Sequence, residues 1–397
     1  MNPPNRSKNP PELPELAPEQ YNLTDLSLDR LRKRRSAKWT AWPPDVLPSF
    51  VAEMDFPLAR PVKEALTCAI ELDDTGYANP DGSGLAAAFA DFARRRFGWE
   101  VDPGQVTATS DVVGGLRALL DLVAGPHQGV VINPPVYFPF FSIVPEAGRE
   151  LAEVPLREDG RLDLEAIGRA FERGARAMIL CSPHNPAGTV PTRAELERLA
   201  ELAVANDAWV LSDEIHAPLT LPGATHVPFV DVSDAARECG ICVTSASKAF
   251  NTAGLVCAVI VTAGERARRL VSELPAGATH PGHLGVIASQ AAFESGDDWL
   301  DQVVAQLDLN RRLLAELLAE HLPAARYRPP EAGYLAWIDA TGLGLGPDPA
   351  TDIFDRARVA VSSGPGFGRG GEGYFRLNIG TSPNLIEAAV RSIAEIT

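Results

Sequence analysis

The sequence predicts an α/β protein in which a large domain with a mostly parallel sheet is joined to a smaller α+β domain. From Pro61 onward, helical patterns alternate with short apolar stretches rich in β-branched residues, as in parallel strands connected by covering helices. A long helical pattern, roughly Asp298 to Glu320, then leads away from this region. With 397 residues the chain is long enough for two domains. We therefore expect the large domain at 60–295 and the small domain at 296–397.

Each element has a local signal. The expected strands of the large domain are short apolar runs, and the expected helices repeat apolar residues every three or four positions. The helix at 192–206 also begins with Thr192 and Glu195, the pair that forms a capping box. The other helices of this domain are expected at 161–173 and 285–294, and its strands at 129–132, 177–181, 208–211, 242–245 and 256–261. In the small domain we expect strands at 333–339 and 373–380 and a closing helix from Asn384.

The first part of the chain has a different composition. Six prolines with Asn, Ser and Glu occupy residues 1–22, which leaves little apolar material for a core, so we expect residues 1–25 to form a flexible tail. Residues 26–59 should join the small domain. They begin with a short basic helix, expected at 26–35, and end with an apolar stretch at 49–56 that suits a lid or a connection.

The overall charge argues against several kinds of partner. A net charge of −16 disfavours nucleic acid, because a protein that neutralises phosphates needs a cationic face. No apolar run approaches the ~20 residues that cross a bilayer, and the N-terminus lacks the apolar segment of a secretory signal. We therefore expect a cytoplasmic protein that does not bind membranes.

The five cysteines do not indicate a metal centre. Their number is odd and most lie in apolar stretches, as expected of reduced, buried thiols. Cys239 and Cys242 form a C-x-x-C pair, but no second cysteine pair or histidine cluster accompanies it. A bound metal is therefore not expected.

Three polar clusters follow predicted strands, at the edge where open α/β sheets bind ligands. The first is a rigid turn at 182–188 that presents Asn185, and the second places Asp213 and His216 three residues apart. The third contains Lys248 directly beyond an apolar strand. A lysine in such a place is desolvated, which disfavours its ammonium form and suits an amine that forms a Schiff base.

Each cluster alone is weak evidence. Asp213 is also compatible with a helix cap, His216 with a hydrogen-bonded core histidine, and Lys248 with a solvated surface residue. Their order and spacing together are more specific. In this respect the chain resembles the fold type I pyridoxal 5'-phosphate (PLP) enzymes, the aspartate aminotransferase superfamily, from about residue 30 to its end.

The resemblance implies a role for each matching residue. Lys248, in an S-x-x-K pattern, would form the Schiff base with the cofactor, and Asp213 would pair with the protonated pyridine nitrogen. Asn185, in H-N-P-x-G, would donate to the phenolic oxygen of the cofactor and touch the substrate carboxylate. Tyr137 resembles the aromatic residue that stacks on the cofactor ring. Arg376 matches the arginine that binds the substrate α-carboxylate, although a surface arginine on a strand is the plainer alternative.

The same resemblance implies a phosphate site and a dimer. The backbone N–H groups of Val112 and Val113 would hold the phosphate with help from Ser245. Asp111 lies beside them where many relatives have glycine, which leaves the geometry of the turn open. Tyr77 resembles the tyrosine that reaches the phosphate of the neighbouring subunit, so we expect a homodimer.

Two departures from ordinary aminotransferases indicate a particular branch. Val256 stands eight residues after Lys248, where many aminotransferases place an arginine, and His216 stands where they usually carry tyrosine. His216 either touches the cofactor oxygen or supports Asp213. With the stretch at 51–56, these features resemble the MalY/PatB branch of cystathionine β-lyase-like C–S lyases. That branch implies that Lys248 removes the Cα proton of an S-substituted cysteine, which then releases a thiol and yields pyruvate and ammonia.

Three other functions remain open at this point. Transamination would use the same residues. A tailoring enzyme for a bulky cysteine conjugate, with decarboxylation or oxidative deamination, is favoured by Phe250, where many close relatives carry tryptophan, and by the 77–84 loop, which lacks a second expected aromatic residue. From another class, the protein could bind PLP and act mainly as a regulatory or interaction protein.

Overall fold

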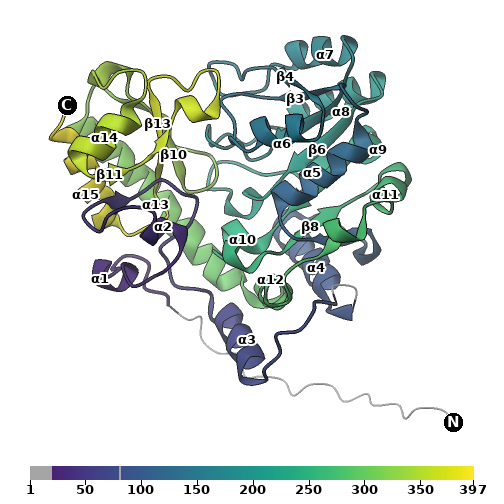
Figure 1. Cartoon of the computed structure of the whole chain (residues 1–397), viewed down its shortest axis with the longest axis horizontal. Coiled ribbons are helices and arrows are strands. Elements are labelled where there is room, and N and C mark those ends of the chain that lie inside the picture. The colour runs from purple at the N-terminus through teal and green to yellow at the C-terminus, as the bar shows by residue number, and fades with distance from the viewer. Residues whose placement is uncertain (1–19, 80–81) are drawn as a thin grey trace.

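The computed structural model describes residues 20–79 and 82–397. Most of the expected tail, residues 1–19, therefore lies outside the described residues. Figure 1 shows the sheet of the large domain on the right and the small domain on the left, with the N-terminal helices α1 (Leu28–Leu31) and α2 (Ala37–Thr40) below the small domain. No helix in the described ranges is both long and apolar enough to span a membrane.

A seven-stranded sheet of order β2-β8-β7-β6-β5-β3-β4 forms the centre of the large domain. Strand β8 (Ala258–Val261) is antiparallel to both of its neighbours, and all other adjacent pairs are parallel. The mostly parallel sheet predicted from the sequence is thereby confirmed. The remaining strands are β2 (Val106–Thr109), β3 (Gly129–Ile132), β4 (Glu150–Glu153), β5 (Ala175–Cys181), β6 (Trp209–Asp213) and β7 (Gly240–Thr244).

The central strands are largely apolar because helices cover both faces of the sheet. Leu180 and Val210 belong to the hydrophobic cluster on one face, and their neighbours Ile179 and Leu211 belong to the cluster on the other. One face is covered by α5 (Val112–Val123), α6 (Phe140–Glu146) and α11 (Glu265–Val271). The other side carries α3 (Arg60–Glu71), α4 (Leu85–Phe97), α7 (Leu164–Glu172), α8 (Arg193–Ala205), α9 (Asp234–Cys239) and α12 (His283–Ser295).

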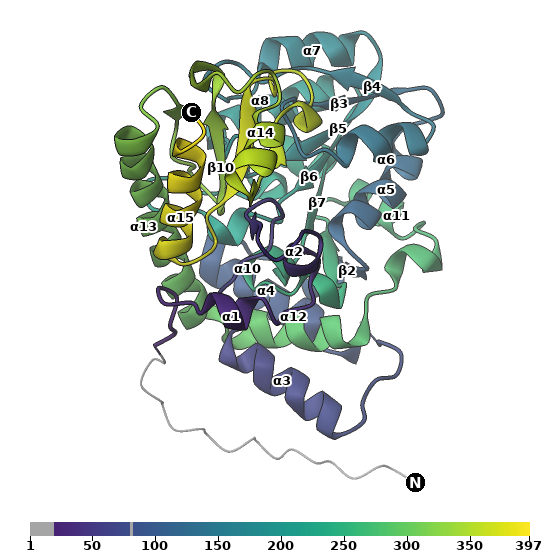
Figure 2. The same ribbon diagram turned by 60° about the vertical axis from the view of Figure 1, so that its left-hand side comes forward.

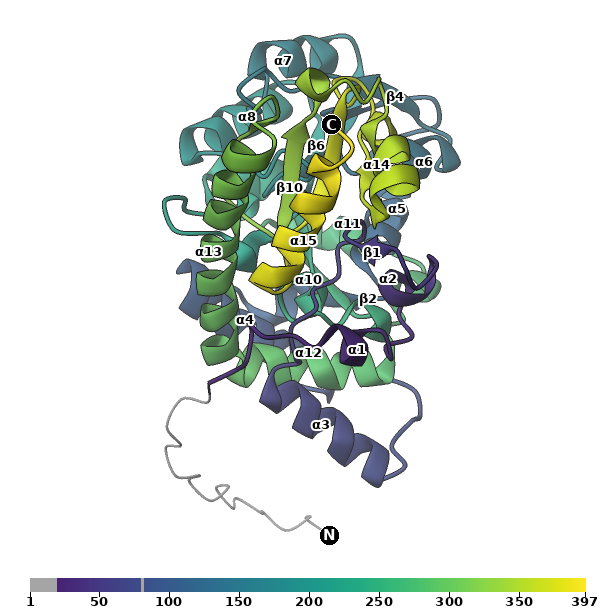
Figure 3. The ribbon, with the colours of Figure 1, turned by 90° about the vertical axis from the view of Figure 1, so that its left-hand side faces the viewer.

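The small domain is a four-stranded antiparallel sheet packed against helices. Its strands, in the order β12-β13-β10-β9, are Ser362–Ser363, Tyr374–Asn378, Leu335–Asp339 and Arg326–Tyr327. Helix α13 (Asp297–His321) packs along α15 (Pro383–Ala394), and Figure 3 shows these two helices side by side. Helix α14 (Pro349–Ala357) completes the domain. Gly296 separates α12 from α13. The domain boundary expected at this residue stays a prediction.

The N-terminal segment lies across the lower part of the small domain (Figure 2). Its strand β1 (Leu47–Pro48) pairs in parallel with β11 (Val359–Ala360). The helix expected at 26–35 covers only 28–31, because the arginine-rich stretch that follows turns away and Arg34 donates to the carbonyl of Asp55 at 2.8 Å. Residues 20–25 also pack, since Leu23 is buried and the hydroxyl of Tyr21 accepts from the N–H of Arg60.

Candidate active site

The parallel strands β5, β6 and β7 bring the three polar clusters to one edge of the sheet. Cys181 at the end of β5 lies opposite Asp213 at the end of β6, which lies opposite Val243 near the end of β7. Asn185 follows β5 by four residues, and Lys248 belongs to α10 (Ala246–Ala249), immediately after β7. The residues predicted to act together therefore meet at the carboxyl edge of the sheet.

The amine of Lys248 is held in a partly buried position. Its Nζ donates a hydrogen bond to the carbonyl oxygen of Ala52 at 3.0 Å. Burial, together with the positive charge of Arg376, lowers the pKa of Lys248 to about 8, although the negative charge of Asp213 opposes the shift. A substantial fraction of this amine is therefore neutral at mildly alkaline pH and able to act as a nucleophile or a base.

Asp213 is a buried carboxylate without an ion-pair partner in the part of the chain that the structure describes. Its Oδ1 accepts a hydrogen bond from the N–H of Ile215 at 3.2 Å. Burial raises the pKa of Asp213 to about 7, because the ionised form loses hydration. A positively charged group placed against this side chain would favour its ionised form.

Arg376 on β13 is a buried cation, with an exposed fraction of 3%. Its Nη1 donates to Oδ1 of Asn185 at 2.9 Å, and its Nη2 donates to the carbonyl of Phe50 at 3.0 Å and to Oγ of Ser362 at 3.1 Å. The ring of Phe367 lies 4.9 Å from the guanidinium carbon. Burial lowers the pKa of Arg376 to about 10.

All of these neighbours of Arg376 are neutral. No carboxylate forms an ion pair with Arg376 within the described ranges, and its buried Nε has no hydrogen-bond partner there. A buried guanidinium that has no counter-ion and has an N–H without an acceptor is suited to bind the carboxylate of a ligand.

Residues 49–56, here called the bridging segment, cross the site between the two domains. Its successive carbonyl groups accept hydrogen bonds from side chains of both domains. The carbonyl of Ala52 accepts hydrogen bonds from Nζ of Lys248 and from the hydroxyl of Tyr334, both at 3.0 Å. The donors to the other carbonyls are Arg376 and Ser362 at Phe50, Asn378 at Val51, Asn378 and Lys38 at Glu53, and Asn251 and Arg34 at Met54.

Most of these donors were not predicted from the sequence to belong to the site. Asn378 lies two residues after Arg376 on the same face of β13, and Asn251 lies three residues after Lys248. This proximity to predicted site residues was the only available signal, because a backbone carbonyl carries no signature in the sequence.

Two further predicted site residues, Tyr137 and His216, lie close enough to the charged groups of the site for those charges to affect their pKa values. Burial raises the pKa of Tyr137 to about 12, and the negative charge of Asp213 adds to the effect. Burial lowers the pKa of His216 to about 3, helped by the charges of Lys248 and Arg376, so its imidazole is neutral. Nδ1 of His216 is buried without a partner among the described residues.

The predicted phosphate end of the site lies at the start of α5. Asp111 caps this helix, since its Oδ1 accepts from the N–H of Gly114 at 2.9 Å. The N–H groups of Val112 and Val113 are in the first turn, where no intrahelical acceptor exists. Ser245 already forms two other hydrogen bonds. Its Oγ donates to the carbonyl of Cys257 at 2.6 Å and accepts from the backbone N–H of Ser247 at 3.0 Å. A phosphate contact by Ser245 would have to replace the first of these bonds, and it stays a prediction.

Tyr77 is not brought to the other site residues within one chain. Its side chain is 99% exposed. Ile70, Leu72 and Val256 are also exposed large apolar residues. A role for Tyr77 in phosphate binding is therefore possible only from a neighbouring chain.

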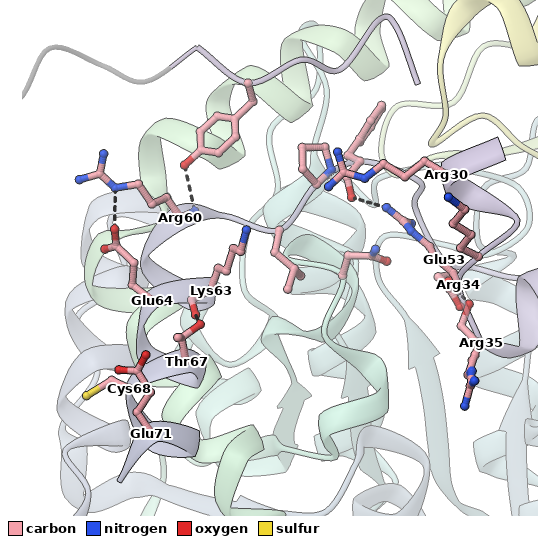
Figure 4. Close-up of a pocket in the computed structure, with 17 residues that line it drawn as sticks. Arg30, Arg34, Arg35, Glu53, Arg60, Lys63, Glu64, Thr67, Cys68 and Glu71 are labelled. Carbon is pink, nitrogen blue, oxygen red and sulfur yellow. Dashed lines mark hydrogen bonds and ion pairs between the residues drawn. The ribbon is translucent and has the colours of Figure 1, made fainter. Parts of the chain in front are cut away.

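Phe250 does not line the site, contrary to the idea that its identity reshapes the pocket. It is completely buried and stacks on Trp299, with ring centroids 5.6 Å apart. A cleft of about 1130 Å³ is lined by Glu53 and Phe56 of the bridging segment and by Asn251, and Lys248 is not part of its lining. Figure 4 shows its lining side chains, with Arg34 and Glu53 on one wall and Arg60 and Lys63 on the other.

The comparisons with known proteins agree with this geometry. A model of the family described as aminotransferase class I and II matches residues 53–393. The chain belongs to this family. The expected fold type I architecture and the resemblance to cystathionine β-lyase-like members are thereby confirmed.

Two relatives and one solved structure illustrate the similarity. A protein of Mycobacterium leprae, provisionally named a cystathionine β-lyase, is 42% identical over 93% of this chain and 96% of its own length. The cystathionine β-lyase of Corynebacterium glutamicum is 36% identical over 93% of this chain and 98% of its own. A Corynebacterium diphtheriae structure, provisionally described as a PLP-dependent β-cystathionase, has a TM-score of 0.90 and 36% identity, covering 94% of this chain and 99% of that one.

Proposed function

We propose that this protein is a PLP-dependent carbon–sulfur β-lyase that converts an S-substituted L-cysteine into a thiol, pyruvate and ammonia. The observation that carries the proposal is that a desolvated Lys248 and a buried Asp213 at the carboxyl edge of the large sheet meet a buried Arg376 from β13 of the small domain. Among the described residues, neither Asp213 nor Arg376 forms an ion pair. Relatives at 36–42% identity that bear the name cystathionine β-lyase support the same reaction.

The residues present fit PLP. Asp213 forms no ion pair with any described residue and has a raised pKa, so a protonated pyridine nitrogen would stabilise its charge. Lys248 supplies the amine for the Schiff base, Tyr137 the stacking ring and Asn185 an amide for the phenolic oxygen. When bound, PLP supplies an electron sink for the negative charge that develops at Cα.

Three side chains of the protein then act on the substrate, two by binding its carboxylate and one by removing a proton. Arg376 binds the α-carboxylate through its Nε–H, which has no partner among the described residues, and through one N–H of Nη2, which gives up its bond to Phe50 or Ser362. Asn185, which already contacts Arg376, limits how that carboxylate can turn. Lys248 takes the Cα proton on Nζ, within reach of the carbonyl of Ala52. The electron pair left at Cα forms a Cα–Cβ double bond as the Cβ–S bond breaks, and the sulfur leaves as a thiolate with the electron pair of that bond. Once released, the enamine product reacts with water to give pyruvate and ammonia.

The remaining contacts complete the cofactor site. Val112 and Val113 direct first-turn N–H groups to the phosphate, where the helix dipole favours an anion. Neutral His216 offers one N–H, either to the phenolic oxygen or in support of Asp213. The working unit is a homodimer in which the fully exposed Tyr77 reaches the phosphate of the neighbouring subunit.

Product analysis tests this proposal against transamination, which would use the same residues. The purified protein is incubated with L-cystathionine and a panel of S-alkyl-L-cysteines without any keto acid. Equal amounts of pyruvate, ammonia and free thiol are expected. Turnover that requires an added keto acid, or conversion of PLP to pyridoxamine phosphate without release of thiol, would contradict the lyase function and favour an aminotransferase.

A further inference from the structure

Asp111 places a carboxylate at the end of the site where the phosphate is expected. The side chain is exposed at the N-terminus of α5 and caps the helix through Gly114. Its second oxygen, Oδ2, accepts from the hydroxyl of Ser110 at 3.1 Å. Burial is the main cause of the raised pKa of Tyr137, but the charge of Asp111 contributes to it. The carboxylate is therefore within electrostatic reach of the ring that is proposed to stack on the cofactor.

The groups around this carboxylate do not neutralise it. No lysine, arginine or histidine forms an ion pair with Asp111 in residues 20–79 and 82–397. The hydroxyl proton of Ser245 is already donated to Cys257. Of the predicted phosphate donors, those not already engaged are the neutral N–H groups of Val112 and Val113, and a dianionic phosphate bound there would face a like charge.

We infer that the carboxylate of Asp111 weakens the hold of this protein on the phosphate group of PLP. Asp111 thus raises the dissociation constant of PLP above the value that the helix N-terminus alone would give, so the cofactor exchanges more readily. The inference rests on the proposed function, because it requires the phosphate of PLP to lie at the start of α5.

The substitution Asp111→Asn separates charge from shape. Asparagine is as good a helix cap as aspartate, so the bond to Gly114 is retained while the negative charge is lost. PLP is removed from the purified protein, and the dissociation constants of PLP and of pyridoxal, which lacks the phosphate, are measured by the absorbance of the Schiff base. We expect about tenfold tighter binding of PLP, no change for pyridoxal, and a smaller difference at high salt because the site is open to solvent.

Asp163→Asn is the matched control. Asp163 caps α7 in the same way, with its Oδ1 accepting from the N–H of Ala166 at 2.9 Å, and the charge change is identical. This variant should bind both ligands like the wild type. An Asp111→Asn protein that binds PLP no more tightly than wild type, or that tightens equally on pyridoxal, would overturn the inference alone. A folded wild-type protein that forms no Schiff base with PLP would overturn the proposed function as well.

Discussion

Arg376→Lys is the sharpest test of how the substrate is held. The substitution keeps the positive charge but replaces the planar guanidinium, which contacts Asn185, Phe50 and Ser362, by a single ammonium. It removes the fork that can bind a carboxylate with two parallel hydrogen bonds. Since one charge-assisted hydrogen bond contributes about 1.5–3 kcal/mol, we expect a loss of about 3 kcal/mol. This corresponds to a decrease of about a hundredfold in kcat/KM.

The assay compares ligands with and without the α-carboxylate. For wild type and Arg376→Lys, kcat/KM is measured with an S-substituted L-cysteine, and the dissociation constant is measured for the corresponding amine, which lacks the carboxylate. Arg376→Lys should lower kcat/KM for the amino acid and leave the dissociation constant of the amine unchanged. Arg149→Lys serves as control, because Arg149 is also a nearly buried arginine that donates to a backbone carbonyl, at 2.9 Å from Ala124, but lies outside the site.

Either of two results would refute the reasoning. An equal loss for the amino acid and the amine would show that Arg376 acts only through the structure around it. An unchanged kcat/KM for the amino acid would show that the carboxylate binds elsewhere. A thermal unfolding midpoint close to that of wild type is required for the comparison, since Arg376 also anchors the bridging segment.

Three further predictions follow from the geometry. Because burial raises the pKa of Asp213 from 3.8 to about 7, the cofactor-free fold keeps a proton that the unfolded chain releases, so its stability should fall as pH rises through that window. The free energy of unfolding, measured with urea at a series of pH values, should fall less steeply with pH in Asp213→Asn than in wild type. An equal slope in both proteins would contradict this prediction. Heterodimers of Lys248→Ala and Tyr77→Ala subunits should regain one working site if Tyr77 acts on the neighbouring subunit, whereas no recovery on mixing would argue for action within one chain. Phe250→Trp should lower the free energy of unfolding by about 1–3 kcal/mol through overpacking, without reordering the substrate panel; a reordered panel would place this residue at the pocket after all.

The elements with strong local patterns were predictable. Strands β5, β6 and β7 are buried on both faces and therefore appear in the sequence as continuous apolar runs. Strands β2 and β4 were missed because they are short edge strands with partly exposed side chains, so no apolar run marks them. The strand expected at 256–261 begins only at Ala258, because Val256 adopts a left-handed backbone conformation with φ of 59°.

The sequence by itself determined the α/β architecture and the grouping of Asn185, Asp213 and Lys248. That grouping follows from local patterns, because the carboxyl ends of neighbouring parallel strands must share one edge. Only the tertiary structure decided that Arg376 has no counter-ion among residues 20–79 and 82–397, that the carbonyl of Ala52 accepts a hydrogen bond from the amine of Lys248 and that Phe250 lies in the core. These properties depend on which distant groups meet, on burial and on backbone carbonyls, and none of them is encoded in the pattern of a single segment.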